Sequence, residues 1–174
     1  MTTISTQRLL LRPHAGLDAA ALVRGLNNFN VSRWTSEIPH PYGLSDAEAF
    51  LALADKPVAG VLRLAITHQD EVVGGILIEA GEIGYWLAEP HWGKGFGTEA
   101  ARSVVDHGFE TMRLAEMQAD YGIGNRASRC ILLGLGFVER GETKSFSKAV
   151  GSEVDVMKLD LTMAAWAAAK ERRQ

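Results

Sequence analysis

The chain has 174 residues, of which 47% are hydrophobic and 22% charged, and its formal net charge is −3. This length suits one domain, 1–174, with a substantial core; the charge argues weakly against nucleic acid as the principal partner, and no apolar run is long enough for a membrane span. The single cysteine, Cys130, excludes an internal disulfide and a cysteine-based zinc site, and the polar N-terminus lacks the apolar segment of a secretory signal, so we expect a cytoplasmic protein.

Hydrophobic periodicity in the first half of the chain predicts a strand, two helices and a β-hairpin. In chain order these are a strand at 6–12, a helix at 17–26, a helix from Ser45 onward, and hairpin strands at 61–67 and 72–78. The stretch 30–44 contains two prolines and a glycine and is predicted to be a loop. Ser45 is placed to cap the second helix, with Glu48 completing a capping box.

The second half of the chain predicts alternating strands and helices. These are a strand at 82–87, a helix at 100–109, a strand at 114–121, a helix from Asn125 to about Leu133, a strand from Phe137, a turn near Gly151, a strand at 154–161 and a terminal helix at 162–173. This order predicts an α+β fold with a mixed, mostly antiparallel sheet of about seven strands flanked by helices. The unit at 82–121 is expected to supply its parallel pair through a right-handed crossover.

A glycine-rich loop lies between the strand at 82–87 and the helix that follows it. It reads Trp92-Gly93-Lys94-Gly95-Phe96-Gly97-Thr98 and has three glycines at alternate positions. Glycine lets the backbone turn tightly and approach a ligand, and the unpaired amides at a helix start bind anions, phosphate best of all. The spacing fits neither the dinucleotide fingerprint nor the P-loop. The loop therefore predicts a different phosphate-containing ligand, and the alternative is a glycine-rich turn without a ligand.

The loop resembles the pyrophosphate loop of the GNAT N-acetyltransferases, Gln/Arg-x-x-Gly-x-Gly/Ala, which binds coenzyme A. Gly95 and Gly97 match the two small positions, and Trp92 replaces the usual Gln or Arg. That replacement is common in the branch of ribosomal-protein N-terminal acetyltransferases called RimJ/RimL. The opening Thr-x-Arg-Leu-x-Leu-Arg at 6–12 and the strand Gly-Tyr-Trp-Leu at 84–87 are also typical of this branch.

A second motif resembles the same family. Asn125-x-x-Ser128, followed by Gly136-Phe137, matches the family's Asn-x-x-Ser helix start and its Gly-Phe ending. The resemblance covers 6–161 and implies the GNAT fold, with acetyl-CoA as co-substrate. The coenzyme-binding residues that it implies are Trp86, Leu87, Trp92, Gly93, Lys94, Gly95, Phe96, Gly97, Thr98 and Asn125.

The resemblance also implies direct attack of an amine on the thioester and suggests the residues that assist it. Glu82 is the candidate base because it starts the strand beside the expected thioester; the alternatives are a solvated charge at a strand end or a water chain. Ser128 matches the proposed acid of the RimJ/RimL branch and is expected to hydrogen-bond the departing thiolate, while the position of the family's more usual tyrosine holds Leu132. The alternative for Ser128 is local capping. Trp34 is either an acceptor-site residue or a core tryptophan.

The expected activity is acetyl transfer to a primary amine, with a protein or peptide N-terminal α-amine as the leading acceptor. A small amine, such as an antibiotic, a polyamine or an amino acid, is the second candidate, and a non-catalytic acyl-CoA-binding module is the third. The expected partners are acetyl-CoA and the amine acceptor, without nucleic acid or membrane, in a monomer or homodimer. The five histidines lack metal-ligand spacing, so no metal site is expected.

Overall fold

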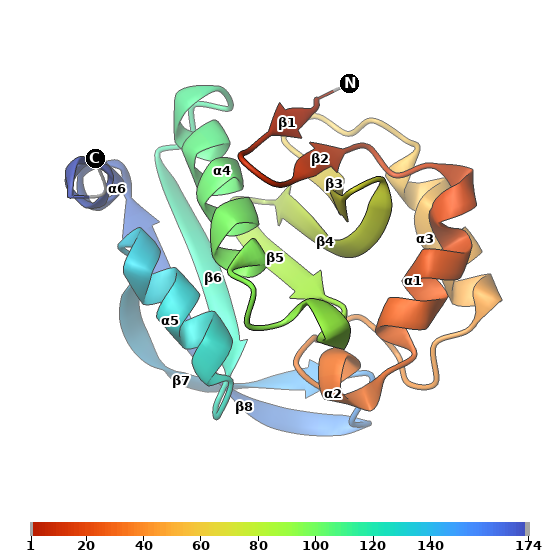
Figure 1. Cartoon of the computed structure of the whole chain (residues 1–174). Helices are drawn as coiled ribbons and strands as arrows, with labels where there is room; N and C mark the ends of the chain where they lie inside the picture. The colour runs from red at the N-terminus through yellow and green to blue at the C-terminus, as the bar shows by residue number, and fades with distance from the viewer. Residues whose placement is uncertain (1, 173–174) are drawn as a thin grey trace.

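Eight strands form one sheet in the order β1-β2-β3-β4-β5-β6-β8-β7 (Figure 1). The structure is a computed structural model that describes residues 2–172. The strands are β1 (Ile4–Ser5), β2 (Leu10–Arg12), β3 (Leu62–His68), β4 (Glu71–Glu79), β5 (Glu82–Leu87), β6 (Glu116–Gly122), β7 (Val138–Ser147) and β8 (Ser152–Thr162). Only the β5–β6 pair is parallel within the described sheet, as the order of elements predicted.

Helices cover both faces of this sheet. They are α1 (Ala19–Leu26), α2 (Phe29–Ser32), α3 (Leu44–Ala54), α4 (Phe96–Glu110), α5 (Arg126–Leu135) and α6 (Met163–Glu171), with short 3-10 helices η1 (Gly16–Asp18) and η2 (Glu89–His91). Helices α4 and α5 pack against the larger buried cluster, and α1, α2 and α3 form a smaller cluster on the opposite face. Within residues 2–172, no helix combines the length and the hydropathy that a membrane span requires.

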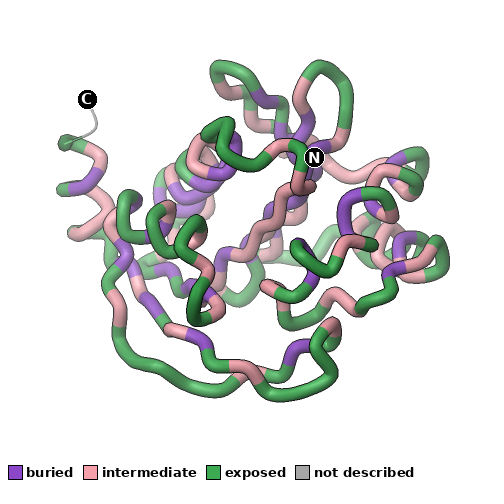
Figure 2. The backbone as a smooth tube through the Cα atoms, turned by 60° about the horizontal axis from the view of Figure 1, so that its bottom comes forward, coloured by how far each residue is buried: buried purple, intermediate pink, exposed green. Residues whose placement is uncertain are grey.

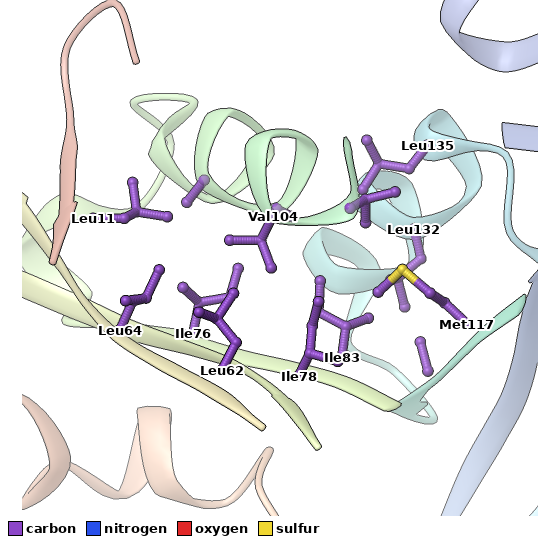
Figure 3. Packing of buried hydrophobic residues seen from close by; sticks show 14 of the residues in the cluster. Leu11, Leu62, Leu64, Ile76, Ile78, Ile83, Val104, Met117, Leu132 and Leu135 are labelled. Carbon is purple, nitrogen blue, oxygen red and sulfur yellow. The ribbon is translucent and has the colours of Figure 1, made fainter. Parts of the chain in front are cut away.

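The larger core lies between α4, α5 and the middle of the sheet. Figure 3 shows Val104 of α4 above Leu64 and Ile76 of the sheet, and Figure 2 shows that buried stretches of backbone gather on the inside of the molecule. Val104 is fully buried, and Ala100, Ala101, Val105 and Phe109 share its face of α4. Burying a side chain of this size stabilises the fold by about 1.5–3 kcal/mol. This packing holds the N-terminus of α4 against the sheet.

Several predicted boundaries differ from the structure. Of the predicted strand at 6–12, only 10–12 forms a strand, β2, because residues 6–9 form a turn in which the Thr6 N–H donates to the Leu9 carbonyl at 2.9 Å. The short strand β1 lies before the predicted range, at 4–5, and raises the number of strands from about seven to eight. Helix α2 starts just before the predicted loop at 30–44 and overlaps its first three residues. The Asn28 side chain caps this helix by accepting from the Asn30 N–H at 3.0 Å.

The start of α3 also differs from the prediction. The helix starts at Leu44 rather than at Ser45, and Gly43 is its N-cap. The carboxylate of Asp46 accepts from the Gly43 N–H at 2.8 Å. The predicted capping box of Ser45 and Glu48 is therefore wrong. The N-cap is Gly43, two residues before Ser45, and Asp46 is the acidic residue that bonds to its N–H.

Strands β5 and β6 separate after a single registered pair. Glu82 lies opposite Gln118, and the Gln118 N–H donates to the Gly81 carbonyl at 2.9 Å. Beyond this pair the sheet contains no further β5–β6 register, although β5 continues to Leu87. The opening between the two strands is the place where the candidate site forms.

Candidate active site

The glycine-rich loop ends at the N-terminus of α4. Gly95 caps the helix in a left-handed conformation with φ of 79°, which costs an L-residue roughly 1–2 kcal/mol. The Glu99 N–H donates to the Gly95 carbonyl at 3.1 Å, so the amides of Phe96, Gly97 and Thr98 precede the first intrahelical bond. These amides and the positive end of the helix are suited to an anion, as the loop sequence predicted. Helix α4 starts at Phe96, four residues before the predicted start at Ala100.

The other loop residues have distinct surroundings. Gly93 is left-handed with φ of 73°. Lys94 is exposed, so its ammonium can reach an anion bound at the loop. Phe96 is only 4% exposed and anchors the start of the helix in the core. A Cβ on Gly97 would lie 3.0 Å from Ile131 Cδ1, so this glycine is also needed for the packing of α5 against α4.

Trp92 connects the loop to β5. Its indole Nε1 donates to the Leu87 carbonyl at 2.8 Å, while the residue remains 42% exposed. The hydrogen bond fixes the path of the chain between the end of β5 and the loop. Trp92 therefore has a structural reason to occupy the position at which the family more often has Gln or Arg.

The hydrogen-bond ladder decides which backbone groups of β5 face the opening. The Ala88 N–H donates to the Val73 carbonyl at 2.9 Å, and bonded and non-bonded pairs alternate along an antiparallel ladder. Tyr85 and Leu87 therefore direct their backbone groups away from β4, towards the opening, while Trp86 directs its own towards β4. For the predicted coenzyme contact, the ladder favours Tyr85 and Leu87 over Trp86.

The start of α5 holds a pair of hydroxyl groups. The Asn125 side chain accepts from the Ser128 N–H at 3.1 Å and caps the helix. The Ser128 hydroxyl instead lies 2.9 Å from the Tyr85 hydroxyl. Because Asn125 supplies the cap, the Ser128 side chain has no capping hydrogen bond in the described structure. Its hydroxyl is directed to β5, next to the opening.

Tyr85 is a functional candidate that the sequence reasoning missed. Burial raises the pKa of its hydroxyl to about 12, and the hydrogen bond with Ser128 lowers it by less. Tyr85 therefore stays protonated at neutral pH and can donate to Ser128. Strand alternation could have revealed it, because Tyr85 shares a face with the core residue Ile83, the face on which α5 packs.

Glu82 lies on the other face of β5, as alternation predicted. Its carboxylate is 45% exposed and lies 3.7 Å from Lys158 Nζ, which also contacts Asp120 at 2.7 Å. Burial lowers the pKa of Lys158, but the interactions with Asp120 and Glu82 outweigh it and raise the pKa. Glu82 and Ser128 thus lie on opposite faces of the sheet, on either side of the opening.

One open cavity of about 760 Å³ extends through this opening. Tyr85, Asn125 and Ser128 line it on the α5 side, and Trp34 and Glu82 line it on the other. Its titratable side chains include five carboxylates and two basic groups, namely Glu37, Asp46, Glu79, Glu82 and Asp120 with Arg63 and Lys148.

Trp34 and Trp86 form aromatic walls of this cavity. The Trp34 ring packs so closely on Gly122 that a Cβ there would lie 3.0 Å from it. The Trp86 ring fits between Gly25 and Gly75, where an added Cβ would lie 2.6 Å from the ring in each case. Both tryptophans line the cavity, so neither serves only as core. No group of three or more potential metal-ligating side chains occurs within residues 2–172.

Residues 8–138 match the family model of the acetyltransferase (GNAT) domain. The chain belongs to the GNAT acetyltransferases. Enzymes of this family use acetyl-CoA as co-substrate, and the anion-binding loop, the opening in the sheet and the Asn125-capped helix fit that use.

Relatives in sequence and structure agree with this assignment. The chain is 30% identical over 171 residues to the uncharacterized N-acetyltransferase p20 of Bacillus licheniformis, covering 92% of this chain and 96% of the relative. The structure of Mycobacterium smegmatis RimJ in complex with CoA-disulfide has a TM-score of 0.82 at 23% identity, covering 98% of this chain and 94% of that one. Spermidine N-acetyltransferase from Vibrio cholerae, in complex with CoA and spermine, has a TM-score of 0.77 at 19% identity, covering 92% and 98%. At these identities the two structures share the fold.

Proposed function

We propose that this enzyme transfers the acetyl group of acetyl-CoA to the N-terminal α-amine of a peptide or protein. The observation that carries the proposal is the division of groups across the β5–β6 opening. The hydroxyl pair of Tyr85 and Ser128 lies on the side of the coenzyme loop, and Glu82 lies on the opposite side. An amine entering from the Glu82 side would meet the thioester at the opening.

In the proposed reaction, Glu82 accepts the proton of the incoming ammonium, directly or through water. The amine nitrogen then forms a bond to the thioester carbon, and the carbon–sulfur bond breaks as the tetrahedral species collapses. The nitrogen releases its second proton to the departing thiolate or to solvent, which leaves the neutral amide. The backbone N–H groups of Tyr85 and Leu87 are placed to donate to the oxyanion. Ser128 donates a hydrogen bond to the departing sulfur while Tyr85 donates to Ser128, so the hydroxyl pair stabilises the thiolate.

The single candidate base, Glu82, favours an α-amine as the acceptor. A peptide α-amine has a pKa of about 7.7–8.0, and a lysine side chain has one of about 10.4. At pH 7, deprotonation costs about 1 kcal/mol for the first and about 4.6 kcal/mol for the second. Glu82 is a half-exposed carboxylate in an ion pair with Lys158 rather than a fully buried base. Such a group suits the acceptor that requires less assistance.

The carboxylates around the cavity favour the second candidate, a small polyamine. Five acidic side chains against two basic ones would attract a ligand with several positive charges. Glu37 and Glu79, however, already form ion pairs with Lys148 and Arg63, at 2.6 and 2.9 Å. Asp120 likewise pairs with Lys158, at 2.7 Å. Three of the five charges are thereby compensated, which favours an acceptor with one positive charge over a polyamine.

Thiol release from acetyl-CoA across matched acceptors tests the proposal. The panel consists of a lysine-free peptide with a free N-terminus, the same peptide N-acetylated with one lysine added, and spermidine. We expect the free α-amine to react fastest and N-terminal blocking to abolish the reaction. Faster turnover of the lysine peptide would contradict the acceptor assignment, and turnover of spermidine alone would establish the polyamine alternative. Coenzyme binding without any turnover would indicate a binding module.

A further inference from the structure

The N-terminal turn at 6–9 lies beside α4 (Figure 1). It hydrogen-bonds to Glu99 in the first turn of that helix, about ninety residues later in the chain. The Glu99 carboxylate accepts three hydrogen bonds from this turn. Thr6 Oγ1 donates to Oε1 at 2.6 Å, the Arg8 N–H donates to Oε1 at 2.8 Å, and Arg8 Nε donates to Oε2 at 2.7 Å. The turn is therefore docked on the helix start that carries the anion-binding amides.

The remainder of the Arg8 guanidinium contacts the glycine-rich loop itself. Its Nη1 donates to the Lys94 carbonyl at 2.8 Å, and the group stacks over the Phe96 ring at 4.8 Å from the ring centre. A Cβ on Gly95 would lie 3.2 Å from Nη2. One side chain thus contacts the loop before Gly95, the cap at Gly95 and the helix after it.

These contacts neutralise the negative charge of Glu99 beside the loop. A carboxylate in the first turn of a helix is favourable towards the helix dipole, but it repels a pyrophosphate bound at the same amides. Burial raises the pKa of Glu99, but hydrogen bonds from Thr6 and Arg8 outweigh it and lower the pKa. Glu99 is therefore charged at neutral pH, and the Arg8 guanidinium supplies the compensating charge.

We propose that Arg8 is a positioning residue for the pyrophosphate loop: it holds the Lys94–Gly95 backbone in place and neutralises Glu99 where the coenzyme's anionic groups bind. It acts through the loop backbone and Glu99. The N-terminal hairpin is thereby part of the coenzyme site, although no glycine motif lies in it.

Coenzyme A and acetyl-pantetheine, which lacks the pyrophosphate and the nucleotide, separate this role from a general effect on folding. We expect Arg8→Ala to weaken coenzyme A binding about tenfold by calorimetry, the equivalent of one charge-assisted hydrogen bond. The affinity for acetyl-pantetheine, measured in the same way, should fall much less than tenfold, because this ligand lacks the pyrophosphate that the loop binds. Arg140→Ala, which removes a comparable exposed ion pair with Asp160 at 2.7 Å, is the matched control and should leave the coenzyme affinity unchanged.

A second variant tests the compensation of charge. Arg8→Ala combined with Glu99→Gln removes both the guanidinium and the repelling carboxylate, so part of the lost affinity should return. Unchanged coenzyme A affinity in Arg8→Ala would overturn the proposal. An equal loss of affinity for acetyl-pantetheine would also overturn it, and so would a double variant that binds coenzyme A no better than Arg8→Ala. The calorimetry needs no acceptor, so its outcome is independent of the proposed α-amine specificity.

Discussion

At the scale of single residues, the chemistry of the candidate site depends on which group satisfies the start of α5. Asn125 caps the helix, so the Ser128 hydroxyl is available to Tyr85 at 2.9 Å. A serine alone is a very weak acid, but a hydrogen bond from Tyr85 makes its hydroxyl a better donor to a developing thiolate. Tyr85 thus supplies a phenol beside Ser128, whereas the helix itself has Leu132 at the position of the more usual tyrosine.

Removing either hydroxyl should lower kcat and leave coenzyme affinity nearly unchanged, because the thiolate develops only in the transition state. Ser128→Ala should cost about 10–100-fold in kcat, the range of one hydrogen bond to a charged group. Tyr85→Phe should cost less, because it acts through Ser128, and should add little in the Ser128→Ala background. Single-turnover kinetics measures the chemical step.

Ser103→Ala is the control for the hydroxyl pair, because the Ser103 hydroxyl donates to the Ala100 carbonyl within α4. It should leave kcat unchanged. Full additivity of the Tyr85 and Ser128 substitutions would show that the two hydroxyls do not act together. A rise in the coenzyme dissociation constant that matched the loss of kcat would show a binding role instead.

At the scale of elements, the coenzyme loop depends on backbone conformations that only some residues adopt. Gly95 has φ of 79° at the N-cap of α4, and Gly97 lies against α5. Substitution at Gly97 would therefore disturb helix packing as well as ligand approach. Gly95 is the cleaner position for testing the loop, because its conformation decides the direction of the amides that follow.

We expect the unmodified protein to bind coenzyme A most tightly, Gly95→Asn less tightly and Gly95→Val least tightly. Asparagine tolerates the left-handed region better than most residues, whereas a β-branched side chain is strained there by more than about 1–2 kcal/mol. Calorimetry should show a loss of at least about tenfold for valine. Gly151→Val is the control, because Gly151 has φ of 76° in the β7–β8 turn, away from the loop; it should lower stability but not affinity. Equal affinities for asparagine and valine would contradict the conformational argument.

At the scale of the whole molecule, a buried histidine couples the fold to pH. His14 follows β2; its side chain is 3% exposed, and its ring lies edge-on to Phe50 of α3 at 4.9 Å. Its Nδ1 has no hydrogen-bond partner among the described residues, and the nearest carboxylate oxygen, on Asp18, is 3.9 Å away. Burial lowers the pKa of His14 to about 4, although the charge of Asp18 opposes this.

Stability should therefore decrease as the pH falls from neutral. Between an unfolded pKa of about 6.5 and the folded value of about 4, the unfolded chain binds a proton that the folded chain does not. The free energy of unfolding should fall by about 2–3 kcal/mol between pH 7 and pH 4.5 through this group. Urea denaturation at the two pH values measures it, and His14→Gln should reduce the loss by this amount.

The control is His40→Gln, because His40 is exposed. In this variant the free energy of unfolding should fall between pH 7 and pH 4.5 by as much as in the unmodified protein. Burial also lowers the pKa of His91 and of His107. These two histidines also destabilise the folded protein as the pH falls, so His14→Gln should still lose some stability between pH 7 and pH 4.5. A variant that lost as much stability as the unmodified protein would show that His14 is charged in the folded state.

The sequence by itself determined the features that depend on local chemistry. The α+β class, the parallel pair, the position of the glycine-rich loop before a helix and the family followed from periodicity, glycine spacing and two motifs. Element boundaries were less accurate where a neighbouring side chain competed for the backbone, as Asp46 does at the start of α3. Those contacts are local, but several residues could make each of them, so the pattern alone does not select one.

Only the tertiary structure decided which residues meet. The Tyr85–Ser128 pair joins positions 43 apart, and the docking of Arg8 on Glu99 joins positions 91 apart. The separation of β5 from β6 after one registered pair is likewise seen only in the structure. Periodicity assigns a side chain to a face but not to a partner on another element. The partners depend on the packing of whole helices and strands, which a one-dimensional pattern does not contain.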